Sequence, residues 1–103
     1  MCGRYSTAKI PKKQFEEKLK VKLEDYSPTF NACPGIAHPV ISSNGDMTKT
    51  SNMIWGLIPQ WSKVHNPEIK PINARSETLF QKPTFKNLIK RKRCLVPASG
   101  YYE

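Results

Sequence analysis

Cys2 follows the initiator methionine, and its position defines the first chemistry that the sequence could support. Removal of Met1 would leave a free α-amine and a thiol on adjacent carbon atoms, which is an aminothiol. Because α-amines have reference pKa values of about 7.7 to 8.0 and cysteine thiols of about 8.5, such groups keep a nucleophilic fraction near neutral pH. An aldehyde would condense with the amine to an imine, which the thiol could close to a five-membered thiazolidine. The simpler alternative is that Cys2 is merely the residue after the initiator.

The other candidate nucleophiles and metal ligands are widely spaced. The three cysteines, Cys2, Cys33 and Cys94, match neither a disulfide framework nor a CxxC zinc motif. Adding His38 and His65 gives no spacing typical of a zinc site. We therefore predict no metal, no cofactor and a reducing compartment, the cytoplasm, with nucleoid association if the protein is bacterial.

The chain is strongly basic. Seventeen Lys and Arg against eight Asp and Glu give a formal net charge of +9, which suits a polyanionic partner such as nucleic acid. A lysine-rich solvated surface of an ordinary protein would explain the charge equally well. The sequence shows neither a secretory leader nor an apolar run long enough to cross a bilayer, so we expect a protein without a membrane partner.

Three segments have clear structural patterns. Apolar residues recur at helical spacing between Pro11 and Tyr26, which predicts an amphipathic helix that stops at Ser27–Pro28. The turn sequence Asn44–Gly45–Asp46 separates two extended stretches, the first beginning at Val40 and the second ending at Trp55. This pattern predicts a β-hairpin. A long irregular segment, including Pro59, Pro67 and Pro71, follows; such loops often have a function.

The last twenty residues predict three short elements. A helix is expected after Pro83, ending in the basic run 90–93. Cys94–Leu95–Val96 has the composition of a buried strand, and Tyr101–Tyr102–Glu103 that of the beginning of another strand. Because an element starts where the sequence stops, we interpret the chain as truncated.

An ordered set of motifs then resembles one known family, the SOS response-associated peptidase (SRAP) family. The matching segments are Met1–Arg4, Asn31 with Cys33–Gly35, Trp55–Trp61, Ile72–Thr78, and Arg93–Ala98 leading to Gly100 and Glu103. The resemblance implies a strand-rich, mixed α/β (α+β) fold, with residues 1–103 forming the N-terminal part of a single SRAP domain whose C-terminal part is absent. It also implies a protein of the DNA damage (SOS) response that acts on abasic sites in single-stranded DNA. The sequence leaves the oligomeric state open, and we expect a monomer.

The resemblance assigns roles to individual residues. Cys2 is expected to be the covalent nucleophile that crosslinks to the ring-opened abasic sugar as a thiazolidine. Asn73 would orient the N-terminal residue or the sugar, and Glu103 would transfer protons during ring opening and imine formation, from a partly buried position. The residues expected to contact DNA are Arg4, Trp61 and Arg75, and those expected to shape the floor of the site are Asn31 and Pro34.

Structural roles explain some of these residues equally well. Trp61 could lie in the core, where we expect Trp55, and Asn31 and Pro34 could form a turn. Arg75 could pair with Glu77 on the surface, an interaction of little energetic consequence.

The sequence also departs from the family pattern. Cys33 stands where the family usually has alanine, and we interpret it as a small buried substitution. The family's downstream active-site histidine has no counterpart, and neither His38 nor His65 lies in the corresponding motif.

Two other functions remain open. One is a cysteine peptidase with an N-terminal nucleophile, which removes its own leader or cleaves another protein. A lyase activity, by contrast, would belong to the proposed DNA crosslinking protein. The other is a non-covalent single-stranded DNA-binding module, in which Lys and Arg neutralise phosphates and tryptophan stacks on bases.

Overall fold

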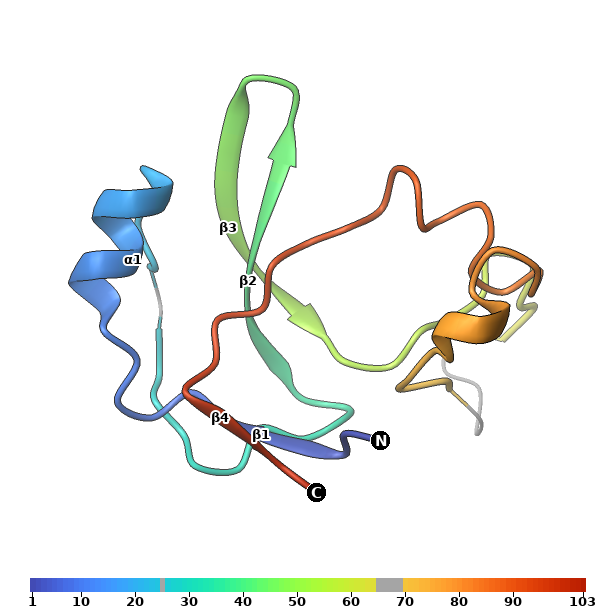
Figure 1. The fold of residues 1–103 in the computed structure, drawn as a ribbon, viewed down its shortest axis with the longest axis horizontal. Helices are drawn as coiled ribbons and strands as arrows, with labels where there is room; N and C mark the ends of the chain where they lie inside the picture. Colours follow the sequence, from blue (N-terminus) through green and yellow to red (C-terminus); the bar gives the residue numbers. More distant parts are fainter. Residues whose placement is uncertain (25, 65–69) are drawn as a thin grey trace. The chain divides into compact units, whose positions relative to one another are not determined.

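The computed structural model describes residues 1–24, 26–64 and 70–103. The chain forms two compact units, one of Met1–Trp55 with Cys94–Glu103 and one of Gly56–Arg93. Within the described ranges the elements, labelled in Figure 1, are β1 (Arg4–Ser6), α1 (Lys12–Leu19), β2 (Ala37–Asn44), β3 (Met47–Ile54), a 3-10 helix η1 (Ser76–Thr78) and β4 (Gly100–Tyr102). This content agrees with the mixed α/β class that we expected.

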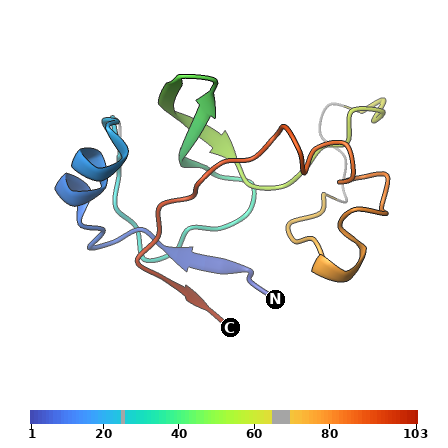
Figure 2. The ribbon, with the colours of Figure 1, turned by 45° about the horizontal axis from the view of Figure 1, so that its top comes forward.

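Strands β1 and β4 join the two ends of the chain. They pair antiparallel, with Arg4 opposite Tyr102, Tyr5 opposite Tyr101 and Ser6 opposite Gly100. Figures 1 and 2 both show the N- and C-termini at the same end of this ribbon. On its other edge β1 bridges to Ala32, because the Tyr5 N–H donates to the Ala32 carbonyl at 3.1 Å and the Ala32 N–H donates back at 2.8 Å. The short strand β1 is therefore held on both edges.

Strands β2 and β3 form the predicted hairpin. The register runs from Ala37 opposite Ile54 to Asn44 opposite Met47, which leaves Gly45 and Asp46 as a two-residue loop. Gly45 has a φ of 67°, the left-handed conformation that tight hairpin turns require at this position. The Ile41 carbonyl and N–H also bond to Leu95, at 2.8 Å each.

Helix α1 is shorter than predicted. It ends at Leu19 because Lys20 adopts a left-handed conformation, with a φ of 55°, so the predicted continuation to Tyr26 is wrong. The chain beyond it remains attached through the Glu16 carboxylate, which accepts a hydrogen bond from the Leu23 N–H at 3.2 Å. Leu23 is fully buried, so its apolar character reflects the core and not a longer helix.

The core of the first unit is small. Its buried apolar side chains are Tyr5, Ala8, Ile10, Leu23, Ala32, Val40 and Ile41. A group of buried hydroxyls lies beside them: Thr7 exchanges hydrogen bonds with Thr29, and the Tyr26 hydroxyl donates to the Thr7 carbonyl. Directed hydrogen bonds thus supplement the limited apolar burial of this unit.

The second unit consists mainly of turns. Residues 59–64 and 70–71 are irregular, as predicted for this loop, while His65 and Pro67 lie outside the described residues. The prediction of a helix after Pro83 is wrong, because residues 83–91 form turns. Helical hydrogen bonds, such as that from the Lys86 N–H to the Lys82 carbonyl at 2.9 Å, occur here only at intervals and do not form a continuous series.

The predicted buried strand at Cys94–Val96 is also wrong. This segment belongs to the first unit, and its strand pairing with other described residues is limited to the bridge between Leu95 and Ile41. All three of its residues are exposed. No helix in the described part of the chain is long and apolar enough to span a membrane.

Candidate active site

The segment before β1 carries the proposed nucleophile. Cys2 is half-buried, and its thiol donates a hydrogen bond to the Arg4 carbonyl at 3.4 Å. Met1 is 88% exposed. The sulfur of Cys2 is thus held near β1, and removal of Met1 would expose the α-amine beside it.

Arg4 presents a cation directly after this segment. It is exposed on β1, and its guanidinium Nη1 donates to Asn31 Oδ1 at 3.3 Å. The Asn31 backbone is itself fixed, because its N–H donates to Thr29 Oγ1 at 3.1 Å. Two residues that the sequence motifs singled out are therefore in contact, and Asn31 orients the guanidinium while leaving most of its donors available for an anion.

Glu103 lies at the same end of the ribbon as Cys2. The register of β1 with β4, continued by one residue, sets Glu103 opposite Gly3. Its side chain is exposed, so the partial burial that we expected is not observed. A solvated carboxylate next to the N-terminal segment is placed to exchange protons with water and with a neighbouring amine.

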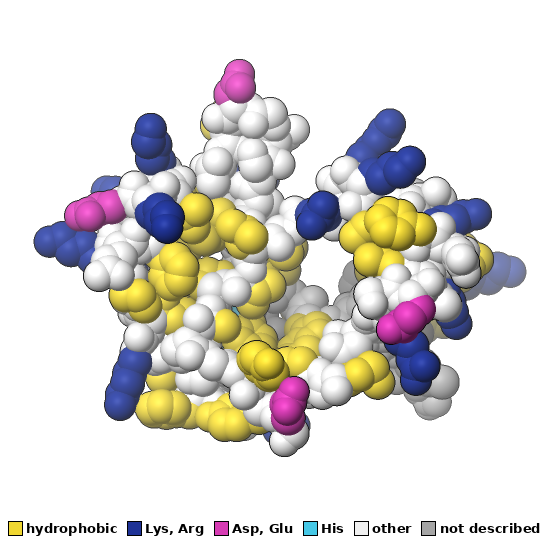
Figure 3. All heavy atoms as spheres, in the orientation of Figure 1, with side chains coloured by type: hydrophobic (Ala, Val, Ile, Leu, Met, Phe, Trp, Pro, Cys, Tyr) yellow, Lys and Arg dark blue, Asp and Glu magenta, His cyan; other side chains and the backbone are white. Residues whose placement is uncertain are grey.

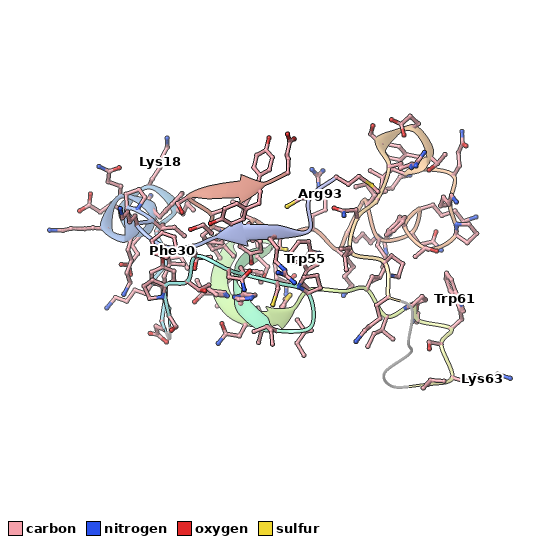
Figure 4. The ribbon with its side chains drawn as sticks, turned by 90° about the horizontal axis from the view of Figure 1, so that it is seen from below. Lys18, Phe30, Trp55, Trp61, Lys63 and Arg93 are labelled. Carbon is pink, nitrogen blue, oxygen red and sulfur yellow. The ribbon has the colours of Figure 1, made fainter. Side chains whose placement is uncertain are left out.

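An aromatic cluster supports β1 from the core side. Tyr5 lies 5.8 Å from His38 in an edge-to-face arrangement and 5.6 Å from Trp55 between ring centroids, distances typical of favourable aromatic pairs. Figure 4 shows Trp55 beside β1; it is half-buried, in partial agreement with the core role predicted for it. Burial, followed by electrostatic interactions with Cys2 and Cys94, raises the pKa of Tyr5 above its ordinary value.

His38 is a feature that sequence reasoning missed. It is only 9% exposed on β2, and its Nε2 atom is buried with no hydrogen-bond partner among the residues that the structure describes. A single histidine in a predicted strand does not indicate that its side chain will be buried against Tyr5. That contact depends on how β1 packs within the first unit. Its role here is to pack beneath β1.

The loop containing Pro34 closes the same unit. The Gly35 N–H donates to the Trp55 carbonyl at 2.9 Å, and Gly35 has a φ of 84°. Pro34 and Cys33 are both half-buried, so Cys33 is less enclosed than we expected. This geometry is a turn, in agreement with the structural interpretation of Pro34.

The remaining predicted site residues, Trp61, Asn73 and Arg75, belong to the second unit. Trp61 is 61% exposed, so the core role considered for it is wrong; Figure 4 shows it on the same loop as Lys63. Asn73 is half-buried, and Arg75 is exposed directly before η1. Glu77 accepts a hydrogen bond from the Ser76 hydroxyl at 3.5 Å.

Comparison with known proteins decides the family. The sequence model of the SOS response associated peptidase (SRAP) family matches residues 1–103. The chain belongs to the SRAP family.

Relatives in this family are named abasic site processing proteins. The chain is 36% identical over 106 residues to abasic site processing protein YoaM of Bacillus subtilis, covering 100% of the chain and 47% of that protein. It is 38% identical to YobE of the same organism, covering 48% of that protein. It is also 36% identical over 90 residues to HMCES of Gallus gallus, covering 76% of the chain and 27% of that protein.

The chain thus spans about half the length of its bacillary SRAP relatives. No solved structure matches it.

Basic side chains are more numerous than acidic ones on the face of this SRAP chain that Figure 3 shows. In Figure 3 they project around α1 and over the turns of the second unit, with few acidic side chains between them. The described residues contain no group of three or more His, Cys, Asp or Glu side chains that could hold a metal ion. The three cysteines are free thiols.

Proposed function

We propose that the chain captures abasic sites in single-stranded DNA by a covalent bond to Cys2. Family membership and the names of the relatives support abasic-site chemistry. The observation that carries the proposal is the pairing of β1 with β4, which sets the segment of Cys2 and the segment of Glu103 at one end of the same ribbon. The segments of Cys2, Arg4 and Glu103, to which we assign the nucleophile, a cation and the proton carrier, therefore belong to one β1–β4 ribbon.

The reaction needs only the aminothiol and an aldehyde. After loss of Met1, the Cys2 amine attacks the C1′ aldehyde of the ring-opened sugar, and proton transfer gives a carbinolamine. Loss of water leaves an imine; the thiolate sulfur then adds to the imine carbon, and the nitrogen takes up a proton. The product is a thiazolidine plus one water, with no change of oxidation state. Because sulfur and nitrogen belong to one residue, ring closure is effectively unimolecular.

The surrounding residues supply proton transfer and charge. The Glu103 carboxylate would accept the proton that the nitrogen releases after the amine has added to the aldehyde, and would return it to the departing hydroxyl. The Arg4 guanidinium, held by Asn31, would bind a phosphate of the DNA backbone. For residues of the second unit, the motifs shared with the family assign a backbone phosphate to Arg75, the orientation of the sugar or the N-terminal residue to Asn73, and a base to Trp61.

Adduct formation tests the proposal directly. Protein lacking Met1 is incubated with a single-stranded oligonucleotide that carries one abasic site, and intact mass is measured after denaturation. The expected product has the combined mass of protein and DNA minus one water, and it forms without a reducing agent. Cys2→Ser keeps the amine but lacks the thiol, so its imine should survive denaturation only after borohydride reduction. Cys94→Ser is the matched control and should form the adduct normally.

Three outcomes would overturn this function. Equal borohydride-independent adducts from wild type and Cys2→Ser would exclude the thiazolidine. Release of a peptide in the absence of DNA, abolished by Cys2→Ala, would favour the peptidase. Salt-sensitive binding that is indifferent to abasic sites, with no adduct, would indicate a non-covalent single-strand binding module.

A further inference from the structure

A tyrosine and an arginine lie side by side on the outer face of the β1–β4 ribbon. Arg4 pairs directly with Tyr102, and residues opposite one another in an antiparallel pair have side chains on the same face, with Cβ atoms about 4.5–5.5 Å apart. Tyr5, the next residue on β1, lies on the other face against His38 and Trp55. Arg4 and Tyr102 therefore face away from that cluster.

Both side chains are available to a ligand. Tyr102 is 51% exposed, a large aromatic surface left in contact with water. Arg4 is exposed, and its guanidinium direction is set by Asn31 at 3.3 Å. An exposed aromatic ring beside an oriented guanidinium is the combination that binds a nucleobase by stacking and its phosphate by charge.

The pair also lies at the correct distance from the nucleophile. Arg4 is two residues after Cys2, so their Cα atoms are separated by at most about 7 Å. That separation is of the order of one nucleotide along an extended strand. A DNA strand whose abasic sugar reaches Cys2 therefore brings its neighbouring nucleotide onto the ribbon.

We infer that Tyr102 and Arg4 form a binding subsite for the nucleotide adjacent to the abasic sugar, with its base on the Tyr102 ring and its phosphate on Arg4. This inference rests on the proposed function and gives it a source of strand selectivity. A base within a duplex already has neighbours on both faces, whereas an unpaired base can place one face on a side chain. The subsite accordingly selects single-stranded DNA.

The chain provides a matched control. Tyr101 is the neighbouring residue, is 68% exposed, and lies on the opposite face of β4, paired with Tyr5. The rate of adduct formation is measured against the concentration of an oligonucleotide with one abasic site. Tyr102→Leu should raise the half-saturating concentration about 5- to 150-fold, the range for loss of one stacked base, with little change in the maximal rate. Tyr102→Phe and Tyr101→Leu should stay within about twofold of wild type.

A second substrate identifies the base that stacks. Replacing each flanking nucleotide in turn by a baseless tetrahydrofuran unit, which has no aldehyde, should weaken wild type at one flank and leave Tyr102→Leu unaffected there, as in a double-mutant cycle. Capture of a small soluble aldehyde should be equal for all variants. Nitration of wild type requires no substitution: single-stranded DNA should protect Tyr102 more than Tyr101.

The results separate the subsite from the covalent chemistry. Wild-type behaviour of Tyr102→Leu, an equal loss in Tyr101→Leu, or equal protection of the two tyrosines from nitration by single-stranded DNA would overturn the subsite. If wild type forms no adduct, binding of a tetrahydrofuran-containing strand is followed by fluorescence anisotropy. A selective loss in Tyr102→Leu would then retain the subsite while the proposed capture fails.

Discussion

The buried hydroxyl of Thr7 gives a sharp test of how β1 is anchored. Thr7 is 1% exposed, and its Oγ1 accepts the Thr29 N–H at 3.0 Å and lies 3.4 Å from the Thr29 carbonyl. Thr7→Val keeps the shape of the side chain but leaves that N–H without its acceptor, which costs about 1–3 kcal/mol. Thr7→Ser keeps the hydroxyl and loses one methyl group, which costs about 1 kcal/mol.

Thermal unfolding measured by circular dichroism distinguishes the two contributions. At about 4–8 °C per kcal/mol for a chain of this size, Thr7→Val should unfold about 5–20 °C below wild type, and below Thr7→Ser. Thr48→Val, on an exposed position of β3, is the control and should change stability by less than about 0.5 kcal/mol. A Thr7→Val protein as stable as wild type would refute the reasoning, because the shape of the side chain and not its hydrogen bond would then hold β1.

Three further predictions concern the hairpin turn, the buried phenol of Tyr5 and the guanidinium of Arg4. Gly45→Ala forces a side chain into a φ of 67° with open space around it, so backbone strain alone should cost about 1–3 kcal/mol; an unchanged urea midpoint would contradict this. Tyr5 has a raised pKa, so above about pH 10 the unfolded chain ionises first and stability falls as the pH rises. The stability of wild type relative to Tyr5→Phe should therefore decrease between neutral and strongly alkaline pH, and a constant difference would contradict the burial of that phenol. Arg4→Gln should reduce the log-log salt slope of single-strand binding by about 0.7, the value for one phosphate contact; an unchanged slope would remove Arg4 from the interface.

Local signals predicted the parts of the fold that depend on local geometry. The hairpin follows from Asn44–Gly45–Asp46, because few residues other than glycine adopt the positive φ that its turn requires. Strand β4 was predicted from Tyr101 and Tyr102, whose side chains favour extended backbone. These elements need little information from the rest of the chain.

The failures occur where tertiary contacts override periodicity. Leu23 continues the helical spacing of Phe15 and Leu19, yet the chain leaves α1 at Lys20 and Leu23 is buried in the core from a segment outside the helix. Cys94–Val96 has the composition of a buried strand, but its pairing with other described residues is limited to the bridge between Leu95 and Ile41. Apolar spacing alone does not show which face of which element will cover a side chain.

The candidate site combines both kinds of information. Motifs identified Cys2, Arg4, Asn31 and Glu103, and the structure brings the first three together around β1 and its neighbouring loop. The register of β1 with β4, which adds Glu103 and Tyr102 to the same ribbon, depends on residues nearly one hundred positions apart. No local pattern in the sequence determines such a register.

The hydrogen bonds that hold β1 also fix the position of the proposed nucleophile, Cys2, although they lie elsewhere on the strand. Cys2 precedes the strand, whereas β1 itself is fixed by Ala32 on one edge and β4 on the other. At the far end of the strand, the Ser99 hydroxyl donates to the Ser6 carbonyl at 3.1 Å. Since these bonds act on the backbone, they determine where an N-terminal amine and thiol can lie without touching either group. Substitutions at the anchors should therefore change the rate at which the aminothiol meets a DNA aldehyde, while its intrinsic reactivity with a small aldehyde stays the same.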